Sequence, residues 1–291
     1  MGQPSGTMDN TVLALDIGGT KTAWSAANSD GELLKSGRFP TPTEPELLIS
    51  TLTKLISQHS CSSVGIGIAG TTKNRQELGI LTNLPKLSGL KLAARLRDNG
   101  APLTIIDNDA RCALVGEVWK GSLQEERNAV FLTIGTGIGG AVLQRGTVLP
   151  YPTDVTMEIS RTIIDPADHF PAPTGQGSLE ALLGGKSLER RFGVSMAELA
   201  KDGHAGKEEA LEIWKIISGY FHESLRAIQD NWQTKQIVIG GKGASDLALY
   251  LGEYTPPFPV VAAQLAEQAG VIGAARLALD IFEDTQKTWD E

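Results

Sequence analysis

The chain has 291 residues and a formal net charge of −8, from 26 basic and 34 acidic side chains. This acidic balance argues against non-specific nucleic-acid binding, and neither a membrane span of ~20 apolar residues nor a signal-peptide pattern is found. The only two cysteines, Cys61 and Cys112, exclude a disulfide scaffold and a cysteine-only zinc site, and are typical of a reducing, cytoplasmic setting.

The first half of the chain alternates short apolar runs with turns and helical patterns. Residues 1–10 are polar and aperiodic, so we expect a disordered start there. Apolar spacing and turn residues then predict the following elements in chain order: strands at 11–17, 21–27 and 33–39, a helix at 45–57, a strand at 64–69, a helix at 90–97, a strand at 103–106 and a helix at 110–120.

The second half repeats this order. It predicts strands at 129–134, 141–144 and 147–149, helices at 179–192 and 207–232, a strand at 236–239, a helix at 245–252, a strand at 259–262 and a helix at 263–280. Two halves of like order predict a duplicated α/β architecture with two lobes, and the alternative is a single mixed α/β domain.

Glycine-rich turns follow three of the predicted strands. The segments Asp16–Lys21 (DIGGTK) and Gly135–Gly140 (GTGIGG) stand at matching places in the two halves, and Gly240-Gly241 follows a third strand. Glycine lets main-chain N–H groups approach a phosphate closely, although hairpin turns favour glycine for their own geometry. The spacing is not that of a P-loop, and residues 141–143 predict a strand where a Rossmann turn requires a helix. Together the turns predict a site that binds the phosphates of a nucleotide.

A run of polar residues lies where the strand at 103–106 gives way to a helix. Asn or Asp at such a place caps the helix, but the three residues Asp107, Asn108 and Asp109 exceed what capping requires. Asp109 can take a proton from a hydroxyl while Asn108 orients it. A base, a metal and phosphate-binding amides are what phosphoryl transfer to an alcohol needs, and Asp16 could hold Mg²⁺ through water.

These segments together resemble the ROK family of sugar kinases, in the actin–hexokinase fold group, over residues 12–279. The resemblance rests on DIGGTK at 16–21, GIGIAG at 65–70, DNDA at 107–110, GTGIGG at 135–140 and AEQAGVIGAA at 266–275. It implies a two-lobed actin/ribonuclease-H-like ATPase fold with a central cleft. The expected lobes are 11–109, completed by the C-terminal helix at 264–280, and 110–263.

The resemblance also implies the roles of individual residues. Asp109 would be the general base. Sugar contacts would come from Gly70, Thr71, Asn108, Asp109, Gly140, Glu158 and Glu180. Nucleotide contacts would come from Asp16, Gly18, Gly19, Thr20, Lys21, Gly135, Thr136, Gly137, Gly240 and Gly241.

The chain departs from the family pattern around the expected sugar site. Arg161 stands in place of a histidine, and Lys86 in place of an asparagine. Three cysteines of a metal-binding segment are replaced by Pro171, Pro173 and Ser178, so no zinc ligand set remains and no structural zinc is expected. His169 lies nearby, where we expect a surface histidine.

The function that this resemblance implies is ATP-dependent phosphorylation of a hexose at its 6-hydroxyl, most closely that of a glucokinase. It further implies ATP and Mg²⁺, and is compatible with a homodimer. The composition and charge predict a cytoplasmic location and neither nucleic-acid nor membrane partners. A kinase for N-acetylmannosamine, N-acetylglucosamine or fructose, a polyphosphate donor, a non-catalytic sugar sensor, and a nucleotide-hydrolysing relative without a sugar substrate stay open as alternatives.

Overall fold

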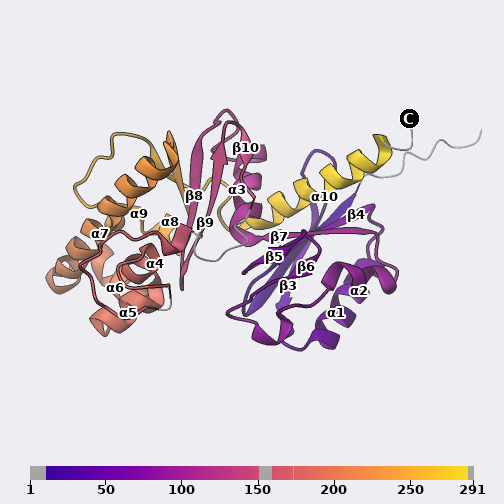
Figure 1. Ribbon diagram of the computed structural model, residues 1–291, viewed down its shortest axis with the longest axis horizontal. Coiled ribbons are helices and arrows are strands. Elements are labelled where there is room, and N and C mark those ends of the chain that lie inside the picture. The colour runs from indigo at the N-terminus through magenta and orange to yellow at the C-terminus, as the bar shows by residue number, and fades with distance from the viewer. Residues whose placement is uncertain (1–10, 151–158, 173, 288–291) are drawn as a thin grey trace, which may run out of the picture. The chain divides into compact units, whose positions relative to one another are not determined.

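The chain divides into two compact units. The structure is a computed structural model that describes residues 11–150, 159–172 and 174–287, so the expectation for residues 1–10 lies outside it. Unit 1 holds the chain up to Lys120 and from Gln268 onward, and unit 2 holds Gly121–Glu267 (Figure 1). The expected boundary after residue 109 differs from this division because helix α3 packs along α10 in unit 1.

Unit 1 is built on a five-stranded sheet with the strand order β3-β2-β1-β4-β7. Strand β2 pairs antiparallel with both β1 and β3, whereas β1, β4 and β7 run parallel. The elements of the unit are β1 (Val12–Ile17), β2 (Lys21–Ala27), β3 (Leu33–Pro40), α1 (Pro45–Ser57), β4 (Ser63–Ile68), β5 (Thr72–Lys73), β6 (Glu77–Leu78), η1 (Pro85–Leu87), α2 (Leu92–Asp98), β7 (Leu103–Asn108), α3 (Asp109–Lys120) and α10 (Ala269–Lys287).

Helices cover both faces of this sheet because the buried residues of β1 alternate between two cores. Leu13, Leu15 and Ile17 pack in a cluster with the apolar face of α1 and α2. Val12 and Ala14 pack in a second cluster with α3 and α10. A sheet that is buried on both faces in this way is typical of α/β proteins.

Unit 2 repeats the same topology with the strand order β10-β9-β8-β11-β12. Here β8 and β9 are antiparallel, and β8, β11 and β12 are parallel, as in unit 1. The identical order in two sheets confirms the predicted duplicated architecture. Its elements are β8 (Ala129–Ile134), β9 (Ile138–Gln144), β10 (Thr147–Val148), η3 (Ile159–Arg161), α4 (Leu179–Leu183), α5 (Gly185–Phe192), α6 (Met196–His204), α7 (Glu208–Trp232), β11 (Gln236–Gly241), α8 (Lys242–Ser245), α9 (Leu247–Leu251), β12 (Val260–Ala262) and η4 (Ala266–Gln268).

Several predicted elements differ from those observed, each for a local reason. The helix expected at 179–192 is broken at Gly184, whose extended backbone ends α4, and the next helix starts against the carbonyl of Gly135. The helix expected at 263–280 begins only at Ala269, after a left-handed Ala266. The hairpin β5–β6 and helix α6 were not predicted.

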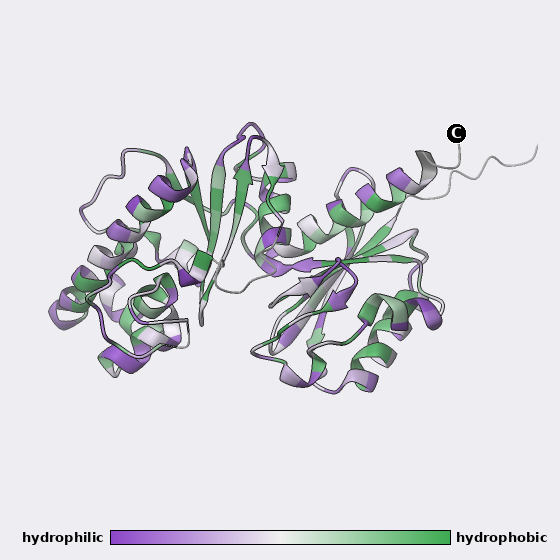
Figure 2. Ribbon diagram, viewed as in Figure 1, coloured by the Kyte–Doolittle hydropathy of each residue, from purple (hydrophilic) through white to green (hydrophobic). Residues whose placement is uncertain are grey.

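The hydropathy along the chain agrees with this layered packing. In Figure 2 the central strands carry many hydrophobic residues, and the helices carry hydrophilic residues on part of their turns. None of the helices in the described part of the chain combines the length and apolar character that a membrane crossing requires.

Candidate functional site

The residues expected to act in unit 1 gather at one edge of its sheet. Asp16 lies near the end of β1, Gly70 follows β4, and Asn108 ends β7. These three strands are parallel, so their carboxyl ends share an edge, which is where open α/β sheets bind ligands. The sequence therefore brings its expected base and its first glycine turn to the same part of unit 1.

The first glycine turn joins β1 to β2 and is tied down through its carbonyl groups. The N–H of Gly18 donates to the carbonyl of Lys21 at 3.1 Å. The hydroxyl of Thr41 donates to the carbonyl of Gly18 at 2.8 Å, and its N–H donates to that of Thr20 at 3.0 Å. A side chain on Gly19 would meet Cβ of Asn83 at 2.9 Å, so the turn is closely packed.

The Asp16 carboxyl is partly buried where α10 begins. A Cβ on Gly270, in the first turn of α10, would lie 2.8 Å from Oδ2 of Asp16, so only glycine allows this approach. Burial raises the pKa of Asp16 to about 6, and the charge of Lys21 opposes this shift. The helix N-terminus favours the charged form of a carboxylate placed beside it.

Asp109 opens α3 and is the most perturbed carboxyl of this edge. Its Oδ1 accepts from the N–H of Ala110 at 2.9 Å and from Nδ2 of Asn108 at 3.0 Å. Burial raises the pKa of Asp109 to about 7, the nearby charge of Asp16 raises it further, and these hydrogen bonds oppose the shift. A carboxyl that titrates near neutral pH is suited to general-base work.

Asn108 is held so that its amide can orient Asp109. Its Oδ1 accepts from the N–H of Arg111 at 3.1 Å, which satisfies one donor in the first turn of α3. Its Nδ2 donates both to Asp109 and to the carbonyl of Gly70, at 3.1 Å. The capping role and the orienting role are therefore filled by one side chain.

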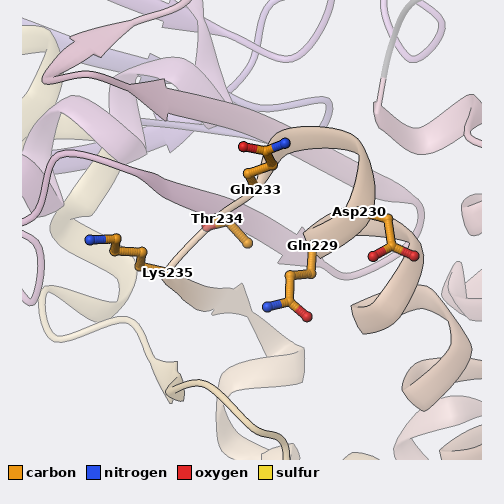
Figure 3. Close-up of a pocket in the computed structure, with 5 residues that line it drawn as sticks. All are labelled: Gln229, Asp230, Gln233, Thr234 and Lys235. Atoms are coloured by element: carbon orange, nitrogen blue, oxygen red, sulfur yellow. The ribbon is translucent and has the colours of Figure 1, made fainter.

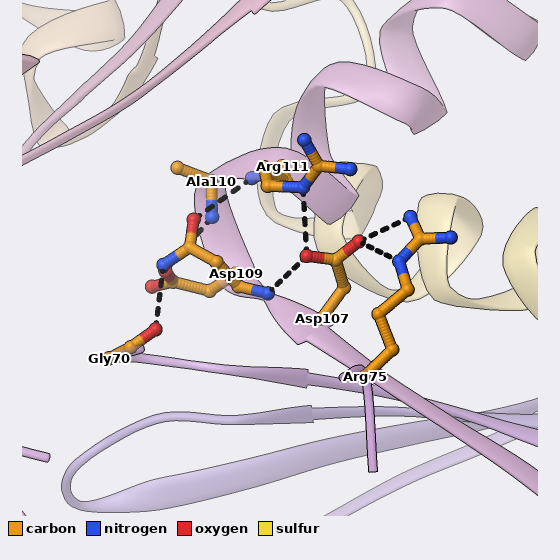
Figure 4. Close-up of polar contacts among 7 residues, drawn as sticks. Gly70, Arg75, Asp107, Asp109, Ala110 and Arg111 are labelled. Atoms are coloured by element: carbon orange, nitrogen blue, oxygen red, sulfur yellow. Dashed lines mark hydrogen bonds and ion pairs between the residues drawn. The ribbon is translucent and has the colours of Figure 1, made fainter. Parts of the chain in front are cut away.

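Asp107, which the sequence singled out with Asn108 and Asp109, forms an ion-pair cluster with Arg75 and Arg111, two residues that sequence reasoning missed (Figure 4). The side chain of Asp107 is 2% exposed, and its Oδ2 accepts from Nε and Nη2 of Arg75 at 3.0 and 2.6 Å. Its Oδ1 accepts from Nε of Arg111 at 2.8 Å and from the N–H of Asn108 at 2.8 Å. Such charge-assisted bonds fix the end of β7, and the i,i+4 spacing of Asp107 and Arg111 was the signal that could have led to Arg111.

Gly70 and Thr71 form the start of a tight loop. Gly70 has a φ of +150°, and a Cβ there would lie 2.4 Å from Leu81 Cδ2. The hydroxyl of Thr71 accepts from the N–H of Ile80 at 2.6 Å. Both residues therefore shape this loop, in which the carbonyl of Gly70 accepts from Nδ2 of Asn108.

The second glycine turn, in unit 2, is shorter than expected because β9 begins at Ile138, leaving Gly139 and Gly140 inside the strand. Its carbonyls accept from the first N–H groups of α5: Gly185 donates to Gly135, and Lys186 donates to Thr136, both at 2.9 Å. A Cβ on Gly140 would lie 2.1 Å from Ile159 Cγ2, so this glycine serves close packing against η3.

Glu180, in the first turn of α4, contacts this turn directly. Its Oε2 accepts from the N–H of Ile138 at 3.0 Å, and a Cβ on Gly137 would lie 2.7 Å from the same atom. The expected sugar ligand and the expected phosphate turn are therefore neighbours in unit 2.

Gly240 and Gly241 end β11 rather than following it. A side chain on Gly240 would strike the ring of Phe131 at 2.5 Å. Gly241 is left-handed, with a φ of +67°, and pairs with Ile134 of β8. Because β8 and β11 are parallel, Gly241 lies at the same sheet edge as Gly135.

The residues that depart from the family pattern lie in both units, with Lys86 in unit 1 and Arg161 in unit 2. Glu158 lies outside the described residues. Arg161 ends η3, beside the strand that carries Gly140, and Lys86 is an exposed residue in an ion pair with Glu44. His169 is exposed, as expected. Within the described residues, no group of three His, Cys, Asp or Glu side chains is arranged to hold a metal ion.

A pocket of about 500 Å³ lies in unit 2 at the C-terminal end of α7, away from the glycine turn (Figure 3). It is lined by Gln229, Asp230, Gln233, Thr234 and Lys235, none of which was predicted to act. Gln233 is the left-handed residue that ends α7, so we attribute this hollow to the helix terminus.

Known proteins resemble this chain in sequence and in structure over almost its whole length. An N-acetylmannosamine kinase from Escherichia coli O7:K1 is 30% identical, over 92% of this chain and 98% of its own length. The crystal structure of a ROK hexokinase from Thermus thermophilus matches with a TM-score of 0.82 and 26% identity, covering 94% of this chain and 99% of the other.

A ROK glucokinase from Streptomyces griseus, solved in complex with glucose and AMPPNP, matches with a TM-score of 0.75 and 21% identity, covering 93% of this chain and 99% of that one. These likenesses confirm the expected actin/ribonuclease-H-like ATPase fold. The model of the ROK family itself matches residues 12–281, and the chain therefore belongs to the ROK family.

Proposed function

We propose that this protein is an ATP-dependent sugar kinase that phosphorylates a hexose at its 6-hydroxyl, with glucose as the first candidate. The observation that carries the proposal is Asp109, a carboxyl with a pKa of about 7 that is oriented by Asn108 at the carboxyl edge of the unit 1 sheet. The names of the relatives, which include a glucokinase and an N-acetylmannosamine kinase, support the reaction class.

Asp109 acts as the general base in this proposal. Its two hydrogen bonds fall on Oδ1, so we assign Oδ2 as the atom that accepts the proton of the sugar hydroxyl. As the proton moves to Oδ2, the hydroxyl oxygen forms a bond to the γ-phosphorus of ATP, and the bond from that phosphorus to the β-phosphate oxygen breaks to release ADP. A base with a pKa near the working pH is deprotonated often enough to act, yet basic enough to accept a proton.

The glycine turns bind the phosphates of ATP in this proposal. Main-chain N–H groups of a glycine turn are compact donors that suit phosphate oxygens, and Lys21 adds a positive charge at the first turn. In unit 2 the residues assigned to this role are Gly135, Thr136 and Gly137, with Gly240 and Gly241 at the same edge.

The unit 1 carboxylates also fit a magnesium ion. The charge of Asp16 raises the pKa of Asp109, and Mg²⁺ prefers carboxylate and water oxygens as ligands. We infer that Asp16 holds Mg²⁺ through water; when bound, the ion offsets the negative charge of the phosphates.

Polar side chains are assigned to the sugar hydroxyls. Asn108 can donate to a hydroxyl, and the Glu180 carboxylate can accept from one. Gly70, Thr71, Gly140 and Glu158 complete the proposed sugar contacts.

A panel of sugars tests this proposal. ADP release should be measured with glucose, N-acetylmannosamine, N-acetylglucosamine and fructose as acceptors. We expect turnover with at least one of them, strongest with glucose. Asp109→Asn should lower kcat by about 10²–10⁴-fold, the range typical of a lost general base. Asp98→Asn, the same change at an exposed site that ends α2, is the matched control and should keep the parent rate.

Two results would end the proposal: equal rates for Asp109→Asn and the parent, or ADP release that is independent of any sugar. Tight sugar binding by calorimetry without turnover would instead favour a non-catalytic sensor, the alternative suggested by Arg161 and Lys86. We also infer a homodimer in the cytoplasm; light scattering of the purified protein should give twice the mass of one chain.

A further inference from the structure

The segment that joins η3 to α4, which we call the 162–178 loop, has no donor set for a metal. The positions where the family resemblance implies cysteines are Pro171, Pro173 and Ser178, and Pro173 lies outside the described residues. His169 is the one imidazole of the loop and is exposed. A structural zinc site needs about four nitrogen or sulfur ligands, so the residues present do not fit one.

The described part of the loop is held by an arginine from α5. Nη1 of Arg191 donates to Oδ1 of Asp168 at 2.9 Å, and Nη2 donates to Oδ2 at 2.7 Å. The guanidinium also lies over the ring of Phe170 at 4.4 Å and over that of Tyr220, on α7, at 5.4 Å. We call these four residues the Arg191 clamp; it joins two loop residues to two helices.

The clamp is shielded from water. The side chains of Arg191 and Asp168 are 14% and 10% exposed, unlike the surface ion pairs of the chain. Hydrogen bonds from Arg191 hold the pKa of Asp168 below its usual range, although burial opposes this shift. A bidentate guanidinium–carboxylate pair of this kind fixes direction as well as distance, and aromatic faces add cation–π attraction.

Backbone hydrogen bonds connect the loop to the start of α4. The N–H of Ile164 donates to the carbonyl of Gly177 at 2.8 Å, and that of Leu179 donates to Thr162 at 2.9 Å. The hydroxyl of Ser178 then caps α4 by accepting from the N–H of Ala181 at 3.2 Å. Glu180 lies two residues after Ser178, and its Oε2 accepts from the N–H of Ile138.

We propose that the Arg191 clamp holds the 162–178 loop without a metal, and that Arg191 is a positioning residue for Glu180. Losing the clamp frees the loop, displaces the capped start of α4 and moves the Glu180 carboxylate. The part that concerns sugar affinity rests on the proposed function, in which Glu180 contacts the sugar.

The first test of the clamp uses the protein without sugar. Arg191→Ala should lower the melting temperature by several degrees. Arg190→Ala is the matched control: it removes the same charge from the preceding residue of α5. Arg190 is exposed, bonds to Lys186 and Ser187 of its own helix, and lies farther from the Phe170 ring than Arg191 does, at 6.0 Å, with no bond to Asp168. The parent protein should contain no stoichiometric zinc by elemental analysis and should keep its melting temperature in excess EDTA or 1,10-phenanthroline.

The second test uses kinetics. Arg191→Ala should raise KM for the sugar about tenfold and change kcat much less, while Arg190→Ala keeps both. Glu180→Gln should give a similar rise in KM, and the double variant should be little worse than either single variant, because both changes act on one contact.

The outcomes separate the clamp from the proposed function. Stoichiometric zinc, melting that falls with a chelator, or equal melting of the Arg191→Ala and Arg190→Ala variants would overturn the clamp. Fully additive effects of Arg191→Ala and Glu180→Gln on KM would overturn the positioning role. A parent protein without sugar turnover would refute the proposed function, while the melting and zinc measurements still decide on the clamp.

Discussion

The crossing of α3 and α10 in unit 1 allows a sharp prediction from one glycine. A Cβ built on Gly273 lies 1.6 Å from the carbonyl oxygen of Cys112 and 2.8 Å from the backbone nitrogen of Gly116. Both neighbours are helix backbone, which cannot rotate away as a side chain can. The change Gly273→Ala therefore forces the two helices apart.

The size of the effect follows from this geometry. A carbon–oxygen contact needs ~3.3 Å, so the helices must part by roughly 1.7 Å. Overpacking typically costs about 1–3 kcal/mol, and a backbone clash this close belongs at the upper end. Alanine regains about 1 kcal/mol of helix propensity over glycine, which leaves a net loss of about 2 kcal/mol. At about 2–4 °C per kcal/mol for a unit of this size, the melting temperature should fall by about 4–8 °C.

A second helical glycine provides the control. Gly219, in the exposed middle of α7, has open space where an added Cβ would lie, with no atom within 4 Å. Gly219→Ala should therefore raise the melting temperature by about 2–4 °C, because only the helix propensity changes. Differential scanning calorimetry of both variants checks the opposite signs. A Gly273→Ala variant that melts at or above the parent temperature would refute the reasoning from this helix crossing.

Further predictions concern the carboxyl edge of unit 1. Because the pKa of Asp109 is raised to about 7 in the folded state, deprotonation costs the parent protein stability as the pH rises from about 4 through 7. Asp109→Asn should therefore melt progressively higher than the parent between pH 4 and 8, whereas the Asp98→Asn control should not; a constant difference across this range would contradict the raised pKa. Arg75→Ala should lower kcat about tenfold and lower the unfolding free energy, measured by urea denaturation, by about 1 kcal/mol. The change removes both Arg75 donors from Oδ2 of Asp107, but the loss is modest because water partly screens Arg75. Lys73→Ala on the same hairpin is its control, and equal rates for both variants would count against a role for Arg75 at the end of β7.

The regular elements could be predicted from the sequence because their apolar spacing is strong. The bounds of β2, α1 and β8 agree with the expected ranges to the residue. The edge that gathers Asp16 and Asp109 could also be inferred, because parallel strands end on the same side. The repeated pattern of the two halves predicted the duplicated architecture, whereas the order of the strands came from the structure.

The parts that could not be predicted depend on contacts between distant short segments. The strands β5 and β6 have two residues each, too few for a period, so the turn that carries Arg75 towards Asp107 left no signal. The Arg191 clamp joins residues 23 positions apart through a loop without periodicity. The helix break at Gly184 depends on the contact between the start of α5 and the Gly135 turn. The leucines of this segment have helical spacing throughout, so the sequence contains no sign of that contact.

The central claim is that the Asp109 carboxylate takes the proton from a sugar hydroxyl during phosphoryl transfer. Its most direct test is a single-turnover measurement of sugar phosphate formation from ATP, with the product position assigned by ³¹P NMR. We expect a sugar 6-phosphate whose rate of formation falls by about 10²-fold or more in Asp109→Asn. The same rate in both proteins, or a phosphate attached at another hydroxyl, would contradict it.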